Sequence, residues 1–325
     1  MYTFEYLRNS VNEAISQEEF IKEPPELYEP IKYALDTGGK RIRPVLALMA
    51  YNLFEEDIHS IIQPLLGLEI FHNFTLIHDD IMDRAHMRRN KPTVHTKWND
   101  NVAILSGDAM FIKAYDYLFQ YRGNSLNDIL ITFNQTALMV CEGQQYDMNF
   151  EEESFVEEQD YLRMIELKTA VLLASSLKIG ALMADASSED VDWLRQFGLF
   201  MGMAFQLQDD YLDAFGDTNV FGKKIGGDIV ANKKTYLFIK TLEKASDQDT
   251  KLLLNLFHST FSGSSETKIQ QVVSTYKKYG IHKLTQEKIG EYYEKAQNAL
   301  DKISVDSVKK QQLISLADKM IKRKM

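Results

Sequence analysis

Two acidic segments are the part of this chain whose residue types and spacing most clearly indicate chemistry. Residues 79–83 and 209–213 both have the pattern Asp-Asp-x-x-Asp. On a helix, the first and last aspartates of such a segment lie about one turn apart on the same face, within reach of a shared cation. Like charges at that spacing destabilise a helix unless a cation neutralises them. The repeated pattern therefore predicts two metal-binding segments rather than two solvated helix ends.

The chemistry of these segments favours magnesium and a diphosphate. Carboxylate oxygens suit a hard divalent cation, and Mg²⁺ fits because it combines few carboxylates with water and phosphate oxygens. Basic side chains follow each acidic segment: Arg84, Arg88, Arg89 and Lys91 after the first, and Lys223, Lys224, Lys233 and Lys234 after the second. Because diphosphate oxygens accept both metal ions and charge-assisted hydrogen bonds, we predict a diphosphate substrate.

Two glycine-containing basic segments are ambiguous by themselves. Residues 38–44 read Gly-Gly-Lys-Arg-Ile-Arg-Pro. Paired glycines allow the backbone to approach an anion closely, and Pro44 fits the first turn of a helix. A helix start with solvated basic residues would look the same. Residues 222–228, Gly-Lys-Lys-Ile-Gly-Gly-Asp, lack the full pattern of a nucleotide-binding P-loop.

The distribution of proline indicates the elements that position these residues. The chain has 6 prolines, and none follows Pro92. This favours long helices over a turn-rich β protein, since an interior proline costs a helix about 3 kcal/mol. Residues 65–77 and 191–212 are apolar at helical spacing on most faces, and each stretch leads into an acidic motif, so we expect two central helices. Ser264 is expected to cap a later helix. We predict one all-α domain over residues 1–325.

The composition narrows the class of protein. The 325 residues include 37 basic and 47 acidic side chains, for a formal net charge of −10, and 45% are hydrophobic. These values predict a soluble globular protein and argue against nucleic-acid binding. No uncharged stretch approaches the ~18 residues of a membrane span, and the N-terminus has no signal-like apolar region, so we expect a cytoplasmic protein. Cys141 is the only cysteine, which excludes an intramolecular disulfide, and we expect it in the core.

Taken together, these motifs resemble the trans-isoprenyl diphosphate synthases of the polyprenyl synthetase family. The resemblance covers residues 38–234 in the family's order and is far more specific as a set than any one motif. Its parts are Gly-Gly-Lys-x-x-Arg-Pro, both aspartate motifs, Arg88-Arg89, Gly143-Gln144-x-x-Asp147, Lys168-Thr169, Phe205-Gln206 and the Gly-Lys…Asp-Ile…Lys tail. It implies an isoprenoid synthase-type bundle of long helices around a central active-site cavity.

The resemblance also implies two adjoining diphosphate sites. In the allylic site, three Mg²⁺ ions would be coordinated by Asp79, Asp83, Asp147 and Asp209, with support from Asp80, Asp210 and Asp213. The same diphosphate would contact Arg88, Lys168, Lys223 and Lys233. Isopentenyl diphosphate, which needs no metal, would be held by Lys40, Arg43, His72 and Arg89. Thr169 and Gln206 would face the reacting carbons beside Lys168.

The implied reaction lengthens a prenyl chain. The allylic carbon–oxygen bond ionises as pyrophosphate departs, the double bond of isopentenyl diphosphate attacks the cation, and a proton is lost. Phe74 precedes Asp79 by five residues, about 7.5 Å at about 1.5 Å per residue, and Phe71 lies further along the same helix. The family associates an aromatic residue there with short products, so we expect farnesyl or geranylgeranyl diphosphate. Family members are usually homodimers.

Several alternatives stay open. Within the family, the chain could make longer polyprenyl diphosphates for quinone side chains, or act as a non-catalytic subunit, although such subunits tend to lose aspartates and none is missing here. A terpene cyclase would usually carry a different second metal site. A di-iron bundle would use Glu-x-x-His, which occurs at residues 56–59 and 69–72. Those two segments are close in sequence and separated by Pro64, whereas di-iron ligands come from separate long helices. Phe74 and His72 could also be ordinary core residues.

Overall fold

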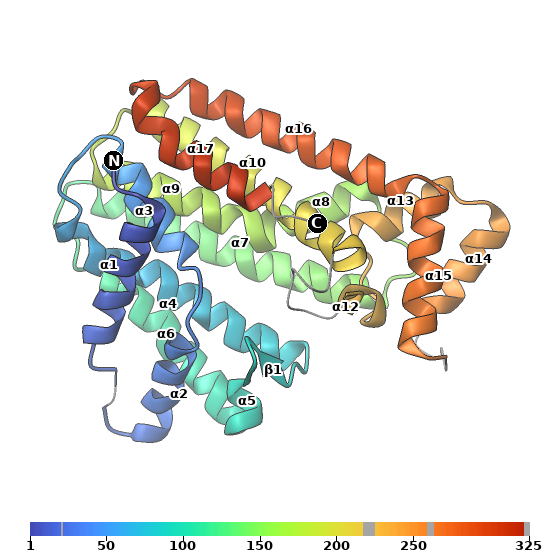
Figure 1. The fold of residues 1–325 in the computed structure, drawn as a ribbon. Helices are drawn as coiled ribbons and strands as arrows, with labels where there is room; N and C mark the ends of the chain where they lie inside the picture. Colours follow the sequence, from blue (N-terminus) through green and yellow to red (C-terminus); the bar gives the residue numbers. More distant parts are fainter. Residues whose placement is uncertain (21, 217–224, 259–262, 322–325) are drawn as a thin grey trace. The chain divides into compact units, whose positions relative to one another are not determined.

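The computed structural model describes residues 1–20, 22–216, 225–258 and 263–321. Helices dominate this part of the chain, and its only strands are the short pair β1 (Met87–Arg88) and β2 (Lys91–Pro92) (Figure 1). The helices are α1 (Phe4–Gln17), α2 (Pro25–Asp36), α3 (Ile42–Asn52), α4 (His59–Met82), α5 (Val94–Lys97), α6 (Asp100–Leu118), α7 (Leu126–Glu152), α8 (Glu158–Ile165), η1 (Glu166–Ala170), α9 (Val171–Met183), α10 (Ser188–Phe215), α12 (Gly227–Val230), α13 (Tyr236–Lys244), α14 (Asp247–Leu256), α15 (Ser265–Lys278), α16 (Ile281–Asp301) and α17 (Ser307–Ile321). The predicted all-α class is confirmed.

The chain divides into two compact units, each assembled from three stretches of sequence. The first unit comprises Met1–Gln135, Ser175–Arg195 and Ile303–Leu313. The second comprises Thr136–Ala174, Gln196–Lys302 and Ile314–Met325. Because neither unit is one continuous stretch, no single linker separates two independent sequence domains. One domain over residues 1–325 remains our prediction.

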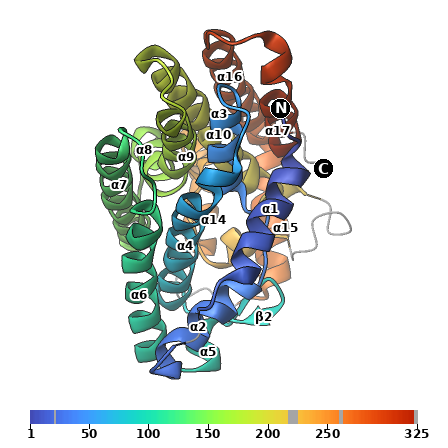
Figure 2. The same ribbon diagram turned by 90° about the vertical axis from the view of Figure 1, so that its left-hand side faces the viewer.

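The helix α4 lies at the centre of the first unit. It packs against α3 and side by side with α6 (Figure 2). Its buried side chains include Leu65, Leu66, Leu68, Ile70 and Phe71. Among the described helices, α4 alone is long and apolar enough to span a membrane, and 67% of the apolar window is buried inside the protein. That burial is typical of a core helix.

The second unit is built around α13. This helix contacts α8, α14, α15 and α16 (Figure 1). Its buried residues Leu237, Phe238 and Ile239 belong to one apolar cluster with Leu207 and Leu212 of α10. The helix α10 covers the second predicted apolar stretch, and α15 begins after Ser264, whose hydroxyl accepts a hydrogen bond from the Thr267 amide at 3.2 Å. The predicted central helix and helix cap are both confirmed.

The helix α7 corrects one prediction. Cys141 is exposed, not part of the core. The buried residues Phe133, Ala137 and Val140 recur at helical spacing and define the inner face of α7. Cys141 directly follows Val140 and therefore turns about 100° away from that face. A single cysteine in the sequence says nothing about its position around the helix.

A π-helix positions two predicted site residues. The segment η1, which carries Lys168 and Thr169, connects α8 to α9. Single π turns of this kind are frequent at functional sites because they redirect side chains. The helix α7 approaches η1 at Gly143, where a Cβ atom would lie 2.3 Å from the backbone nitrogen of Lys168 and 2.7 Å from its Cα. Only glycine permits this close approach.

We therefore expect Gly143→Ala to destabilise the protein by about 1–3 kcal/mol, because the added methyl group must push α7 and η1 apart. The activity that the family resemblance implies should fall as well, since η1 carries Lys168 and Thr169. Chemical denaturation measures the first effect and steady-state kinetics the second.

Gly290→Ala is the matched control, since a Cβ atom at Gly290 in α16 would meet nothing within 4 Å. In that open helical position alanine should be neutral or stabilising by about 0.5–1 kcal/mol. Equal effects of the two substitutions would contradict the packing argument.

Candidate active site

The second acidic motif lies in the last two turns of α10, and its members have different surroundings. Asp210 is 5% exposed and accepts hydrogen bonds from the Tyr161 hydroxyl and, at 3.0 Å, from Gln206 Nε2. The two carboxylate oxygens of Asp213 accept from the backbone amides of Gly227 and Asp228 at 3.1 and 3.0 Å. Asp213 therefore anchors α12, and Asp210 is held in place from both sides.

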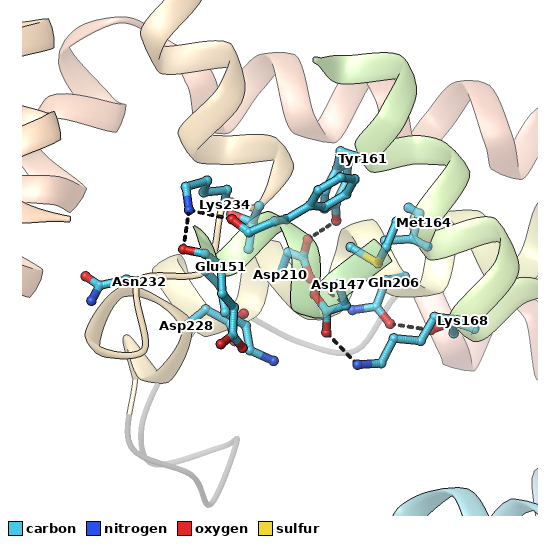
Figure 3. Close-up of a pocket in the computed structure, with 15 residues that line it drawn as sticks. Asp147, Glu151, Tyr161, Met164, Lys168, Gln206, Asp210, Asp228, Asn232 and Lys234 are labelled. Atoms are coloured by element: carbon cyan, nitrogen blue, oxygen red, sulfur yellow. Dashed lines mark hydrogen bonds and ion pairs between the residues drawn. The ribbon is translucent and has the colours of Figure 1, made fainter. Parts of the chain in front are cut away.

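A pocket that is open to solvent lies beside this motif in the second unit. It brings together many of the residues that the sequence singled out (Figure 3). The predicted residues among its lining are Asp147, Lys168, Thr169, Gln206, Asp210 and Lys233. Asp209 and Asp213 belong to the same unit but do not line it. Lys223 lies outside the described residues.

Four of the lining residues form two polar contacts along one edge of the pocket (Figure 3). The Lys168 ammonium donates to a carboxylate oxygen of Asp147 at 2.5 Å, and the Thr169 hydroxyl donates to Gln206 Oε1 at 3.0 Å. Both contacts depend on η1, which turns Lys168 towards α7 and Thr169 towards α10. A lysine, a carboxylate and two uncharged dipoles thus face one cavity.

The electrostatics of the pocket favour a cation. Burial and the negative charges of Asp213 and Asp209 raise the pKa of Asp228 to about 6. Burial and the charge of Asp228 also raise the pKa of Asp210 well above its ordinary value. Crowded, partly desolvated carboxylates resist ionisation until a positive charge arrives. Their oxygens are the ligands that a hard divalent cation prefers, so this donor set fits Mg²⁺.

The lining also includes residues that were not assigned a site role from the sequence, among them Asp228, Lys234, Tyr161 and Asn232. Asp228 stands in the quoted Gly-Lys…Asp-Ile…Lys tail and could have been found there. Lys234 was noted only as a basic residue, and its ammonium donates to the backbone carbonyls of Phe150 and Glu151 at 2.5 and 3.1 Å, at the end of α7. Tyr161 and Asn232 carry no motif, so only the folded structure identifies them.

The first acidic motif ends α4 in the first unit. Asp80 is 4% exposed, and both of its oxygens accept from Arg88 Nε at 2.9 Å. Asp79 is half-buried, whereas Asp83 is exposed at the end of the helix. Arg88 reaches Asp80 from a two-residue hairpin whose turn, Arg89 and Asn90, has positive φ at both positions, as tight hairpins require.

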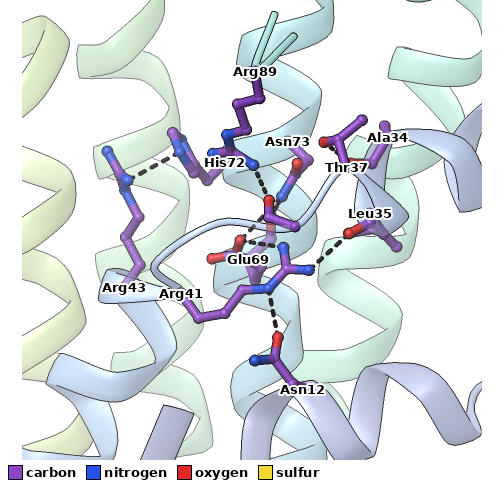
Figure 4. Close-up of polar contacts among 11 residues, drawn as sticks. Asn12, Ala34, Leu35, Thr37, Arg41, Arg43, Glu69, His72, Asn73 and Arg89 are labelled. Carbon is purple, nitrogen blue, oxygen red and sulfur yellow. Dashed lines mark hydrogen bonds and ion pairs between the residues drawn. The ribbon is translucent and has the colours of Figure 1, made fainter. Parts of the chain in front are cut away.

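A separate basic cluster lies in the first unit around the loop before α3 (Figure 4). Arg43 donates to His72 Nε2 at 2.9 Å, and Arg89 donates to the backbone carbonyl of Gly38. Burial, together with the charge of Arg43, lowers the pKa of His72 well below its ordinary value, so the ring is neutral at pH 7. Lys40 is exposed in the same loop. The cluster thus contains Arg43, His72 and Arg89 of the four residues predicted for a metal-free diphosphate, and the fourth, Lys40, belongs to the same loop.

An aromatic cluster packs behind the first motif. The ring of Phe74 stacks on that of Phe111 with 5.2 Å between centroids, and lies 5.6 Å from the ring of Phe71. Phe71 is 1% exposed and also packs edge-on against Phe133 at 5.1 Å. Both predicted chain-length residues therefore belong to one aromatic layer within the first unit.

The predicted metal sites are not preformed cages. Among the described residues, no three His, Cys, Asp or Glu side chains are grouped to hold a metal ion by themselves. Mg²⁺ commonly binds through one or two carboxylates, with waters and substrate phosphates supplying the rest. The role of each predicted residue remains a prediction.

Comparisons with known proteins support the same chemistry. The geranylgeranyl diphosphate synthase of Methanosarcina mazei is 36% identical over 315 residues, which cover 96% of this chain and 94% of that protein. The geranylfarnesyl diphosphate synthase of Natronomonas pharaonis is 36% identical over 258 residues, covering 74% of this chain and 76% of that protein.

Solved structures agree. A geranylgeranyl pyrophosphate synthase matches with a TM-score of 0.94 and 39% identity over 100% of both chains. The geranylgeranyl pyrophosphate synthase of Corynebacterium glutamicum, solved with isoprenyl diphosphate and magnesium, matches with a TM-score of 0.86 and 26% identity over 99% of this chain and 98% of that one. The profile of the polyprenyl synthetases matches residues 24–276. The predicted prenyl transfer is confirmed, and the chain belongs to the polyprenyl synthetase family.

Proposed function

We propose that this enzyme condenses isopentenyl diphosphate with an allylic diphosphate (dimethylallyl, geranyl or farnesyl) to give all-trans farnesyl or geranylgeranyl diphosphate. The observation that carries the proposal is the presence of two chemically different anion sites. One, the pocket of the second unit, combines carboxylates with lysines, and suits a metal-bound diphosphate. The other gathers arginines around a neutral histidine, and suits a diphosphate without metal. In a reaction between two diphosphate substrates, only the allylic substrate loses its pyrophosphate. The two substrates therefore need sites of different chemistry.

Divalent metal fits the acidic sites, and we propose three Mg²⁺ ions held by Asp79, Asp83, Asp147 and Asp209, with Asp80, Asp210 and Asp213 supporting them. Asp80 and Asp210 would act from the buried positions described above, and Asp213 by anchoring α12. Bound Mg²⁺ supplies positive charge that stabilises the departing pyrophosphate. The crystallised relative from C. glutamicum contains magnesium, in agreement with this choice.

The protein's own groups complete the chemistry. Lys168, Lys233 and Arg88 hold the allylic diphosphate oxygens, and we propose the same role for Lys223. Thr169 and Gln206 turn their oxygen dipoles towards the positive charge that develops on the allylic carbons. The apolar lining residues Met164 and Ile165 keep water from that carbon. The double bond of isopentenyl diphosphate attacks, and the released pyrophosphate accepts the proton that leaves.

The reaction is tested by incubating the purified protein with Mg²⁺, isopentenyl diphosphate and each allylic diphosphate in turn, followed by identification of the product. We expect a product of 15 or 20 carbons and no product in EDTA. Asp79→Asn and Asp209→Asn should each lower kcat by about 10²-fold or more, because each removes charge that stabilises the leaving group.

Asp192→Asn is the control for removing a carboxylate, since Asp192 pairs with Arg195 at the surface. Its activity should match that of the wild type. Undiminished turnover by the Asp79→Asn/Asp209→Asn double variant would refute the mechanism.

Product length is proposed to be limited by the aromatic layer. Phe74→Ala should lengthen the main product by at least one isoprene unit, because it opens space between Phe71 and Phe111 in the path of the growing chain. The measurement is the distribution of product chain lengths for the variant and the wild type. Phe155→Ala, at a position 52% exposed in the other unit, should leave the product unchanged. An unchanged distribution for Phe74→Ala would mean that Phe74 is only a packing residue.

Two alternatives within the family are less well supported. A non-catalytic subunit would not need its aspartates, yet Asp80 and Asp210 are both held by specific hydrogen bonds. A longer-chain synthase would need an open path where Phe74 and Phe111 stack. The names of the similar proteins, geranylgeranyl and geranylfarnesyl diphosphate synthases, also favour a short product.

We further propose that the enzyme is a cytoplasmic homodimer. Leu105, Ile112 and Phe119 are 60%, 65% and 50% exposed. Their seven-residue spacing places them along one face of α6 and its C-cap residue, Phe119. An exposed apolar stripe of this length is typical of a protein–protein interface, and a second copy of the chain would cover it.

Ile112→Asp should therefore shift the protein from twice the chain mass of 37.5 kDa to the monomer mass in light scattering, because the stripe then carries a charge. Val308→Asp, at an apolar position 78% exposed elsewhere, is the control and should stay dimeric. A wild-type protein that is monomeric at micromolar concentration would contradict the proposal.

A further inference from the structure

The loop that carries Lys40 and Arg43 has an unusual backbone. Between α2 and α3, Gly38 and Gly39 have φ values of 76° and 147°, and Arg41 has φ of 51°. A left-handed conformation at a non-glycine residue costs about 1–2 kcal/mol, so other interactions must hold Arg41 there. The strain is placed inside the segment proposed to bind isopentenyl diphosphate.

The side chain of Arg41 supplies those interactions (Figure 4). Each of its three nitrogens donates to a different element: Nε to Asn12 Oδ1 of α1 at 3.1 Å, Nη2 to the Leu35 carbonyl of α2 at 2.7 Å, and Nη1 to Glu69 Oε1 of α4 at 2.8 Å. The side chains of Arg41 and Glu69 are only 4% and 2% exposed. Arg41 therefore does not point to the surface as its basic neighbours suggested, but ties the loop to three helices.

Glu69 is held just as firmly and lies next to the anion-binding residues. Asn73 Nδ2 donates both to the Glu69 backbone carbonyl at 2.8 Å and to Glu69 Oε1 at 3.2 Å. One turn further along α4, His72 accepts the hydrogen bond from Arg43. Glu69 is thus the buried carboxylate around which the loop, His72 and Arg43 are arranged.

Two atoms in this cluster have no hydrogen-bond partner among the described residues. They are Arg43 Nε and Glu69 Oε2, and both are buried. Burial lowers the pKa of Arg43 to about 10, the charge of Glu69 opposes that shift, and Arg89 adds to it. Unpaired buried polar atoms are costly. Of the two, the Arg43 Nε–H is a cationic donor of the kind that a diphosphate oxygen accepts from, whereas Glu69 Oε2 is an acceptor and would not bind an anion.

We propose that Arg41 and Glu69 are positioning residues that hold the loop of residues 38–43 and His72 in the geometry that binds isopentenyl diphosphate. The inference rests on the proposed function, because it assigns a task to the same site. A buried ion pair is seldom worth its desolvation cost as a source of stability. Three different partners for one guanidinium instead specify the position of a strained loop.

Three variants test the proposal. Arg41→Lys keeps the charge but cannot reach three partners at once. Glu69→Gln keeps the shape and an acceptor oxygen but removes the negative charge. Asn12→Ala removes one partner from an exposed position of α1, so this variant should fold even if a buried substitution does not. Asp192→Asn serves again as the control for the loss of a surface ion pair.

The measurements are the Kd for isopentenyl diphosphate in EDTA, by calorimetry, and the KM values for both substrates. We expect the Kd and KM for isopentenyl diphosphate to rise about tenfold in Arg41→Lys and Glu69→Gln, and about twofold in Asn12→Ala. The KM for the allylic diphosphate should change less than twofold, and the control should match the wild type. A purely structural pair would lower kcat, or the amount of folded protein, without separating the two substrates.

The sign of the Glu69→Gln effect discriminates further. If Glu69 acted only through its charge, its removal would increase the positive potential and tighten diphosphate binding. Tighter binding, or equal changes for both substrates, would overturn the inference while leaving the proposed reaction intact. A wild-type protein that does not bind isopentenyl diphosphate without metal would overturn both.

Discussion

Two clusters of aspartates lie at the C-terminal ends of helices, where negative charge is unfavourable, and the proposed metal chemistry depends on this arrangement. The carbonyl end of a helix carries about half a negative charge, and acidic side chains there are unfavourable. Both aspartate motifs occupy that position, the first at the end of α4 and the second in the last two turns of α10. The chain therefore carries two unfavourable clusters of negative charge that bound cations would stabilise, and the chemistry that we propose uses those cations.

The negative charge of the two motifs is stabilised in a similar way, although the motifs belong to different units. In each, the middle aspartate is buried and hydrogen-bonded, Asp80 to Arg88 and Asp210 to Tyr161 and Gln206. The partner of Asp80 is a cation, whereas those of Asp210 are neutral. The first motif is therefore already partly neutralised by the protein. The raised pKa values of Asp210 and Asp228 indicate that the second motif has the greater need of a cation.

The helical class and the reaction could be predicted because they depend on features that repeat along the chain. Proline placement and apolar spacing identified α4 and α10, and the order of several short motifs identified the family. Single residues were harder. Cys141 was placed in the core without its helical phase, and Tyr161 has no sequence signal because its partner Asp210 is 49 residues away. Long-range contacts of this kind depend on packing, which local patterns do not contain.

Arg41 and Glu69 illustrate why residue type alone is ambiguous. A basic residue between Lys40 and Arg43 looks like one more anion contact, yet its guanidinium is buried among protein acceptors. Residues 69–72 have the Glu-x-x-His pattern of di-iron proteins, which would bind a cation. Here the glutamate binds Arg41, and the histidine accepts from Arg43. An arginine from the loop contacts each of these side chains, so the same two residue types suit the anion site that we propose. The charge of the neighbouring side chains, and not the Glu-x-x-His spacing, therefore determines whether such a glutamate and histidine suit a cation or an anion.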